Sequence, residues 1–148
     1  MILEILAWIS TALHPVPSAH LASRVVGEPG MEVELLRICR RESRCQRVGI
    51  HAVDAWASPR VYTRAVEAGW VSPGCQPYQP GEWSSRGAWG LMAAYNLKWA
   101  GVQCLPPWAL DVPLVSAVIA ARKLKAHCET PERRRHPAIT RWGKCDWR

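Results

Sequence analysis

The apolar positions between Met31 and Ser43 repeat at helical spacing, and the charged positions fall opposite to them. The apolar side of this pattern consists of Met31, Leu35, Ile38 and Cys39. The opposite side carries four arginines, Arg37, Arg40, Arg41 and Arg44. The pattern predicts a helix whose arginines face solvent. Glu42 continues the apolar side at the C-terminal end, so we expect an unpaired carboxyl there.

A second apolar stretch runs from Met1 to Leu13 and is interrupted by Glu4. It is too short to span a bilayer, and no basic residue precedes it, so it is a poor secretory signal. We expect a helix that packs on the domain or on a partner protein. The segment from His14 to Pro17 ends it. The predicted organisation is an N-terminal apolar helix and linker over residues 1–30, followed by one domain over 31–148.

The third helical pattern covers Val112–Cys128, with Asp111 as the expected N-cap and Pro113 in the first turn. Residues 114–121 are apolar on nearly every side, which predicts a buried central helix. A chain of 148 residues has room for one domain with a core. The fold class that these patterns predict is mainly α.

The net charge and the aromatic content exclude few classes of binding partner. The formal net charge is +7, which favours polyanions such as bacterial cell wall, nucleic acid or an acidic membrane. The chain contains nine tryptophans and no phenylalanine. Tryptophan suits stacking on sugar rings, but it also fills cores.

The chain has six cysteines, and none of them forms a CxxC pair or a zinc-module spacing with histidine. Disulfides, reduced structural cysteines and a scattered metal site all remain open. We expect structural cysteines. A Cys39–Cys45 bridge would hold the end of the Glu42 helix, and distal pairs such as Cys128–Cys145 are equally compatible with the sequence.

Glu42 is the main candidate for chemistry. Desolvation on the apolar side and the negative end of the helix dipole both favour the protonated form of a carboxyl at this position. A protonated carboxyl is what general-acid cleavage of a glycosidic bond requires. The alternative is a solvated glutamate at a helix end with no chemical role.

A second motif, downstream of Glu42, supports a catalytic role for this residue. Glu42-Ser43 is followed by Ser84-Ser85-Arg86-Gly87-Ala88-Trp89-Gly90-Leu91-Met92, and the two motifs together resemble those of the lytic transglycosylase (SLT) family of the lysozyme-like superfamily. Trp142-Gly143 is similar to the family's third, aromatic element. The resemblance covers residues 31–143. Ala93 replaces the family's glutamine and Trp142 its tyrosine, and the long interval between the motifs implies an insert at about residues 49–82.

The resemblance implies a lysozyme-like single domain with an active-site cleft. Its substrate would be peptidoglycan, cut at the bond from N-acetylmuramic acid to N-acetylglucosamine with a 1,6-anhydro product. Glu42 would be the general acid and base, without cofactor or metal. The substrate-binding residues it implies are Ser43, Ser85, Gly90, Leu91, Met92 and Trp142.

Three alternatives remain. A hydrolytic muramidase would need a second acid, for which Asp54 is the candidate. A non-catalytic cell-wall-binding or virion assembly protein would keep the fold alone. Nucleic-acid binding through the arginines lacks a recognition module. We expect action in the periplasm or cell wall, and the apolar N-terminus would suit a phage-encoded lysin or virion component that contacts other virion or envelope proteins.

Overall fold

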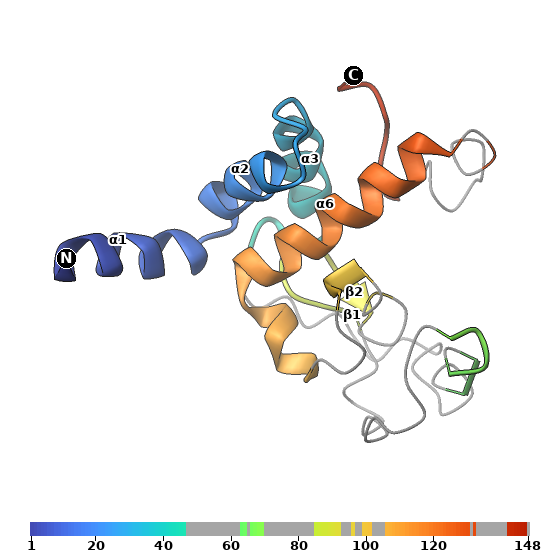
Figure 1. The fold of residues 1–148 in the computed structure, drawn as a ribbon, viewed down its shortest axis with the longest axis horizontal. Helices are drawn as coiled ribbons and strands as arrows, with labels where there is room; N and C mark the ends of the chain where they lie inside the picture. The colour runs from blue at the N-terminus through green and yellow to red at the C-terminus, as the bar shows by residue number, and fades with distance from the viewer. Residues whose placement is uncertain are drawn as a thin grey trace.

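The computed structural model describes residues 1–46, 63–64, 66–69, 85–92, 96, 99–101, 106–130, 132 and 142–147. These residues are mainly helical, as predicted (Figure 1). The elements are α1 (Ile2–Ala12), α2 (Pro15–Val25), α3 (Met31–Ser43), β1 (Ser85–Arg86), β2 (Leu91–Met92), η2 (Pro107–Asp111) and α6 (Pro113–Glu129). No helix in the described part of the chain is long and apolar enough to cross a membrane.

Helix α6 is the central element, as its sequence predicts. No side chain between Asp111 and Ala121 is exposed, and α6 contacts α2, α3 and η2. The helix begins one residue later than predicted, at Pro113, and Val112 occupies the N-cap position. Asp111 does not cap it. The Asp111 carboxylate instead accepts a hydrogen bond of 2.7 Å from the Arg86 guanidinium and so connects η2 to β1.

Helix α2 occupies a segment for which the sequence predicted a linker. His14 stands at its N-cap, and the prolines of the HPVP sequence lie in its first turn, where a missing N–H has no consequence. Ser18, Ala19, Ala22 and Ser23 are its small buried residues, and they allow α2 to lie close against α6.

Helix α3 confirms the predicted apolar side, because Met31, Leu35, Ile38 and Cys39 are all fully buried. The arginine side is less simple than predicted. Arg37 pairs with the buried Glu34 carboxylate, and this hydrogen bond raises the pKa of Arg37 above its usual value. The same carboxylate accepts a hydrogen bond of 2.6 Å from the backbone N–H of Lys144. Glu34 therefore attaches the C-terminal segment to α3.

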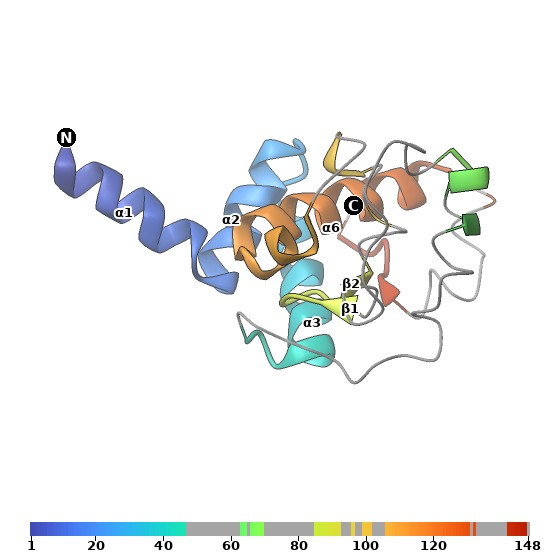
Figure 2. The ribbon, with the colours of Figure 1, turned by 90° about the horizontal axis from the view of Figure 1, so that it is seen from below.

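Helix α1 does not pack on the domain along its length. Within this fully described helix no residue is buried, and Figures 1 and 2 show it projecting from the body. The prediction of a helix in this segment is confirmed. We expected the helix to pack on the domain or on a partner protein. It contacts α2 and α6 but projects from the body over most of its length, and packing on a partner protein stays a prediction.

Two disulfides are present among the described cysteines. Cys39–Cys45 links α3 to the residue that follows its end, and Cys128–Cys145 links α6 to the C-terminal segment. Both pairs were among those that the sequence allowed. Cys75 and Cys104 lie outside the described residues.

The two disulfides should stabilise the fold to different extents. Replacing both Cys128 and Cys145 with serine should lower the free energy of unfolding by about 3 kcal/mol, and replacing Cys39 and Cys45 by about 2 kcal/mol, because the first bridge spans 17 residues and the second only 6. Urea unfolding of the two double variants measures the difference. Free thiols at these four positions in the natively produced protein would contradict the prediction.

Candidate active site

The candidate site lies where the C-terminal end of α3 meets the turn of the β1–β2 hairpin. The hairpin pairs Ser85 with Met92 and Arg86 with Leu91, so residues 87–90 form the turn. Glu42 occupies the last turn of α3, and its side chain remains 27% exposed. The carboxyl is thus partly desolvated and still accessible.

Gly90 lies directly against Glu42. A Cβ atom built on Gly90 would stand 3.1 Å from Oε2 of Glu42 and 3.3 Å from its Cβ. Gly90 has a φ of +59°, in the left-handed region that glycine tolerates best. Two sequence motifs separated by almost fifty residues are therefore in contact, and glycine at position 90 permits that approach.

Gly87 begins the same turn for a related reason. Its φ is +74°, and a Cβ on it would come within 2.0 Å of the carbonyl oxygen of Leu110. No other residue fits at this distance without a backbone shift. Because glycine has no side chain, the backbone of the turn packs directly against η2.

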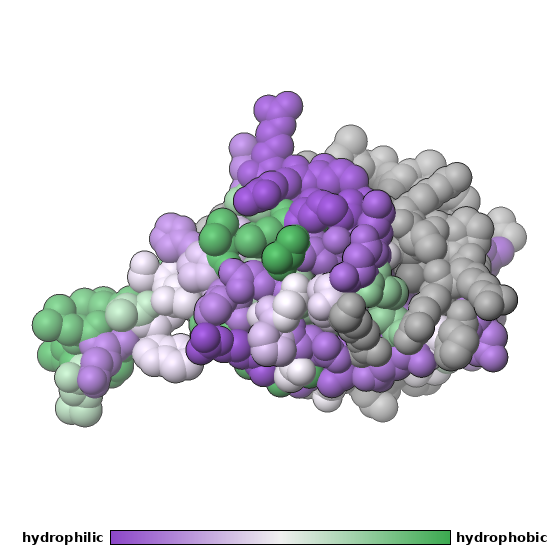
Figure 3. All heavy atoms as spheres, turned by 90° about the horizontal axis from the view of Figure 1, so that it is seen from above, coloured by the Kyte–Doolittle hydropathy of each residue, from purple (hydrophilic) through white to green (hydrophobic). Residues whose placement is uncertain are grey.

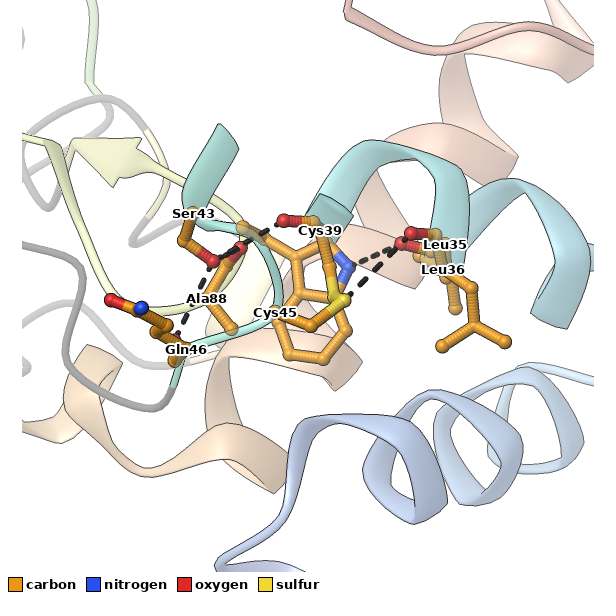
Figure 4. The surroundings of a disulfide bond; sticks show 8 residues. Leu35, Leu36, Cys39, Ser43, Cys45, Gln46 and Ala88 are labelled. Atoms are coloured by element: carbon orange, nitrogen blue, oxygen red, sulfur yellow. Dashed lines mark hydrogen bonds between the residues drawn. A yellow bond between two sulfur atoms is a disulfide. The ribbon is translucent and has the colours of Figure 1, made fainter. Parts of the chain in front are cut away.

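The two residues between these glycines fasten the turn to α3. The Ser43 hydroxyl lies 2.8 Å from the carbonyl oxygen of Ala88, and the Trp89 indole donates a hydrogen bond of 2.9 Å to the carbonyl of Leu35. Ala88 and Trp89 are fully buried. Figure 4 shows the Ser43 hydroxyl between the end of α3 and Ala88, beside the Cys39–Cys45 disulfide. Ser43 therefore attaches the hairpin turn to the end of α3.

Helix α3 ends in an uncommon backbone conformation beside Glu42. Arg44 and Cys45 have φ values of +57° and +56°, although neither is glycine. Their backbone N–H groups donate to the carbonyls of Arg40 and Cys39, and the disulfide to Cys39 holds Cys45 from its side chain. These constraints fix the point at which α3 stops, and thereby the position of Glu42.

Arg41 is the partner of Glu42 that sequence reasoning missed. Its Nε and Nη2 atoms lie 2.9 and 2.5 Å from Oε1 of Glu42, and Nη2 also lies 2.9 Å from the carbonyl oxygen of Trp142. The expectation of an unpaired Glu42 is wrong. Adjacent helix positions do not normally face each other, which is why helical periodicity placed Arg41 on the opposite side. Its long side chain nevertheless reaches back at the helix end.

The C-terminal segment reaches the end of α3 through Trp142 and Gly143. Gly143 fits between the side chains of Ile38 and Leu124, and Trp142 is placed beside Arg41 through its carbonyl. The Trp142 ring lies 4.5 Å below the Lys123 ammonium of α6. Its indole N–H is buried and has no hydrogen-bond partner in the described structure. Trp142 therefore lies next to the site, where its carbonyl oxygen accepts a hydrogen bond from Arg41.

The remaining predicted residues divide into two groups. Ser85 and Met92 form the pair at the open end of the hairpin, and the Leu91 side chain is buried in the core, so only its backbone can face a ligand. Asp54 lies outside the described residues, as does most of the insert at 49–82.

The described site offers acid–base chemistry. Oε1 of Glu42 is held by Arg41, while Oε2 faces Gly90 and receives no hydrogen bond from the described part of the chain. Elsewhere in that part, no cluster of three His, Cys, Asp or Glu side chains is arranged to hold a metal ion. Among the described residues at the end of α3, the Glu42 carboxyl is therefore the candidate for acid–base chemistry, through its Oε2 atom.

Comparison with protein-family models, with curated proteins and with solved structures gives no match to this chain.

The effect of the close approach of Gly90 to Glu42 on stability can be measured by mutation. Gly90→Ala should destabilise the protein by more than Gly27→Ala. Both residues have a left-handed φ, for which alanine costs about 1 kcal/mol, but only the Gly90 methyl group meets a neighbour; nothing lies within 4 Å of a Cβ on Gly27. Chemical unfolding of the two variants gives the comparison. Equal losses would show that Glu42 moves away freely and that the contact is not specific.

Proposed function

We propose that this chain is a lytic transglycosylase that cleaves the glycan strands of peptidoglycan with Glu42 as its acid and base. The observation that carries the proposal is the contact between Gly90 and the Glu42 carboxyl. Two motifs that resemble those of the SLT family meet at one glutamate, whose side chain is 27% exposed and whose Oε2 atom lies next to the hairpin turn. Under this proposal the domain is lysozyme-like, and its cleft runs along the hairpin and the end of α3.

The reaction would use Oε2 of Glu42, the oxygen that Arg41 does not hold. In the first step, Oε2 gives its proton to the oxygen that leaves with N-acetylglucosamine, and the bond from that oxygen to C1 of N-acetylmuramic acid breaks. In the second step, the muramic 6-hydroxyl bonds to C1 and returns its proton to the Glu42 carboxylate. No water is consumed, so a single carboxyl suffices.

The remaining residues would position the sugar. The backbone of Leu91 and Met92 is paired in β2, Gly90 lies in the turn before it, and Ser85 stands at the open end of the hairpin. Ser43 contributes by holding the turn, because its hydroxyl lies at hydrogen-bond distance from the Ala88 carbonyl. Trp142 would border the bound strand next to Arg41.

One observation favours the non-catalytic alternative. Glu42 is the carboxylate partner of an ion pair with Arg41, whereas a general acid must carry a proton when it reacts. Catalysis would therefore require the bound sugar to displace Arg41 from Glu42. A wall-binding protein that has lost activity would have no such requirement.

Glu42→Gln tests the catalytic role. The glutamine keeps the shape of the acid and an oxygen for Arg41, but it cannot deliver a proton, so cleavage of purified peptidoglycan should fall by about 10²–10⁴-fold or more. Turbidity loss measures cleavage, with a thermal melt and wall co-sedimentation on the same sample. Folding and wall binding should survive.

Glu32→Gln is the matched control, because Glu32 is also partly exposed on α3 but bonds His20, away from the hairpin. It should retain activity. An active Glu42→Gln protein would remove the catalytic assignment. A wild-type protein that binds wall and never cleaves it would establish the non-catalytic alternative.

Product analysis separates the transglycosylase from the muramidase. We expect 1,6-anhydromuramic ends, which are one water lighter than hydrolysed ends by mass spectrometry. Asp54→Asn should then have only a mild effect on the rate. Reducing muramic ends as sole product, together with an inactive Asp54→Asn variant, would assign the protein as a muramidase instead.

A further inference from the structure

Helix α1 exposes more large apolar side chains than any other described element. Six of them, Ile2, Leu3, Ile5, Leu6, Trp8 and Ile9, are between 49% and 82% exposed. Figure 3 shows them as a hydrophobic arm that stands apart from the more polar surface of the body. An exposed apolar surface of this kind marks an interaction site.

The distribution of these side chains around the helix indicates what covers them. At 100° per residue, the six occupy an arc of about 220°, more than half of the circumference. A helix that binds in a protein groove presents one narrower stripe at positions i, i+3, i+4 and i+7. A groove would leave part of this arc in water, whereas the acyl region of a lipid layer can cover all of it.

The narrow polar side of α1 suits the same location. Glu4 is its only charged side chain, and Thr11 and Ala7 lie on the same side. The Thr11 hydroxyl donates a hydrogen bond of 2.8 Å to the carbonyl of Ala7 and so remains satisfied without water. Glu4 would face the aqueous side. With 11 residues, α1 is about 16 Å long and can lie within one leaflet.

The charge of the body selects the kind of lipid. The chain carries a net charge of +7, and the two helices that α1 contacts, α2 and α6, display exposed arginines at Arg24 and Arg122. A basic body next to an apolar helix is attracted to anionic headgroups.

We propose that α1 inserts into the surface of an anionic lipid bilayer, with its apolar arc in the acyl region and the body of the protein held at the headgroups. The inference is independent of the proposed cleavage of peptidoglycan. It concerns a different face of the molecule and needs no activity.

Vesicle flotation of the full chain tests this proposal. The wild-type protein should float with vesicles of phosphatidylcholine and phosphatidylglycerol, and at least tenfold less with phosphatidylcholine alone. The double variant Leu6→Asp/Ile9→Asp should lose at least tenfold in binding to the anionic vesicles, because two charges would enter the acyl region. It should melt at the wild-type temperature, since α1 buries no residue.

The matched control is Val33→Asp/Trp108→Asp, which adds the same two negative charges at apolar positions on α3 and η2 that are at least as exposed as Leu6 and Ile9. It should float like the wild-type protein. Failure of the wild type to float would overturn the proposal, and so would equal losses in both double variants, which would assign binding to net charge alone. A wild-type dimer in analytical ultracentrifugation that needs Leu6 and Ile9, without vesicle binding, would identify a second copy as the occupant and also overturn it.

Discussion

The described structure depends on the contact between the turn at residues 87–90 and the end of α3. Four successive residues of that turn each have a different physical reason for their identity. Gly87 fits under a carbonyl oxygen, Ala88 is buried with its carbonyl facing Ser43, Trp89 fills the core and bonds Leu35, and Gly90 leaves room for Glu42. A larger residue at Gly87 would collide with Leu110 of η2, and one at Gly90 would collide with Glu42 of α3. The candidate site exists only while this contact is maintained.

The C-terminal segment secures the other side of α3. It is held at three successive points: its Trp142 carbonyl by Arg41, its Lys144 N–H by the buried Glu34, and Cys145 by the disulfide to α6. Hydrogen bonds to a charged group inside a protein are stronger than those between neutral groups, so Glu34 is an effective anchor. Chain segments distant in sequence thus enclose the end of α3, which explains why a single glutamate there has a defined environment.

A general acid must be both correctly positioned and protonated, and the contact of Arg41 with Glu42 serves only the first of these requirements. Its guanidinium orients Glu42 and connects it to the C-terminal segment, but the same ion pair occupies the carboxyl group that would have to carry a proton. An acid that must be both positioned and protonated can satisfy the two requirements in sequence, if a bound sugar displaces the guanidinium. The apolar helix α1 lies apart from this site, and it offers a way to hold the protein at a lipid surface.

The sequence by itself determined the helices whose patterns are one-sided or wholly apolar. The apolar side of α3, the buried centre of α6 and the helix at Ile2–Ala12 all follow from side-chain periodicity, and the sequence motifs alone single out Glu42 and Gly90. Only the tertiary structure decided which groups pair. Arg41 turns back to Glu42, Asp111 bonds Arg86 instead of capping α6, and α1 extends away from the body. Periodicity predicts which side of a helix a residue occupies. The partner of that residue depends instead on which distant segment of the chain packs next to the helix.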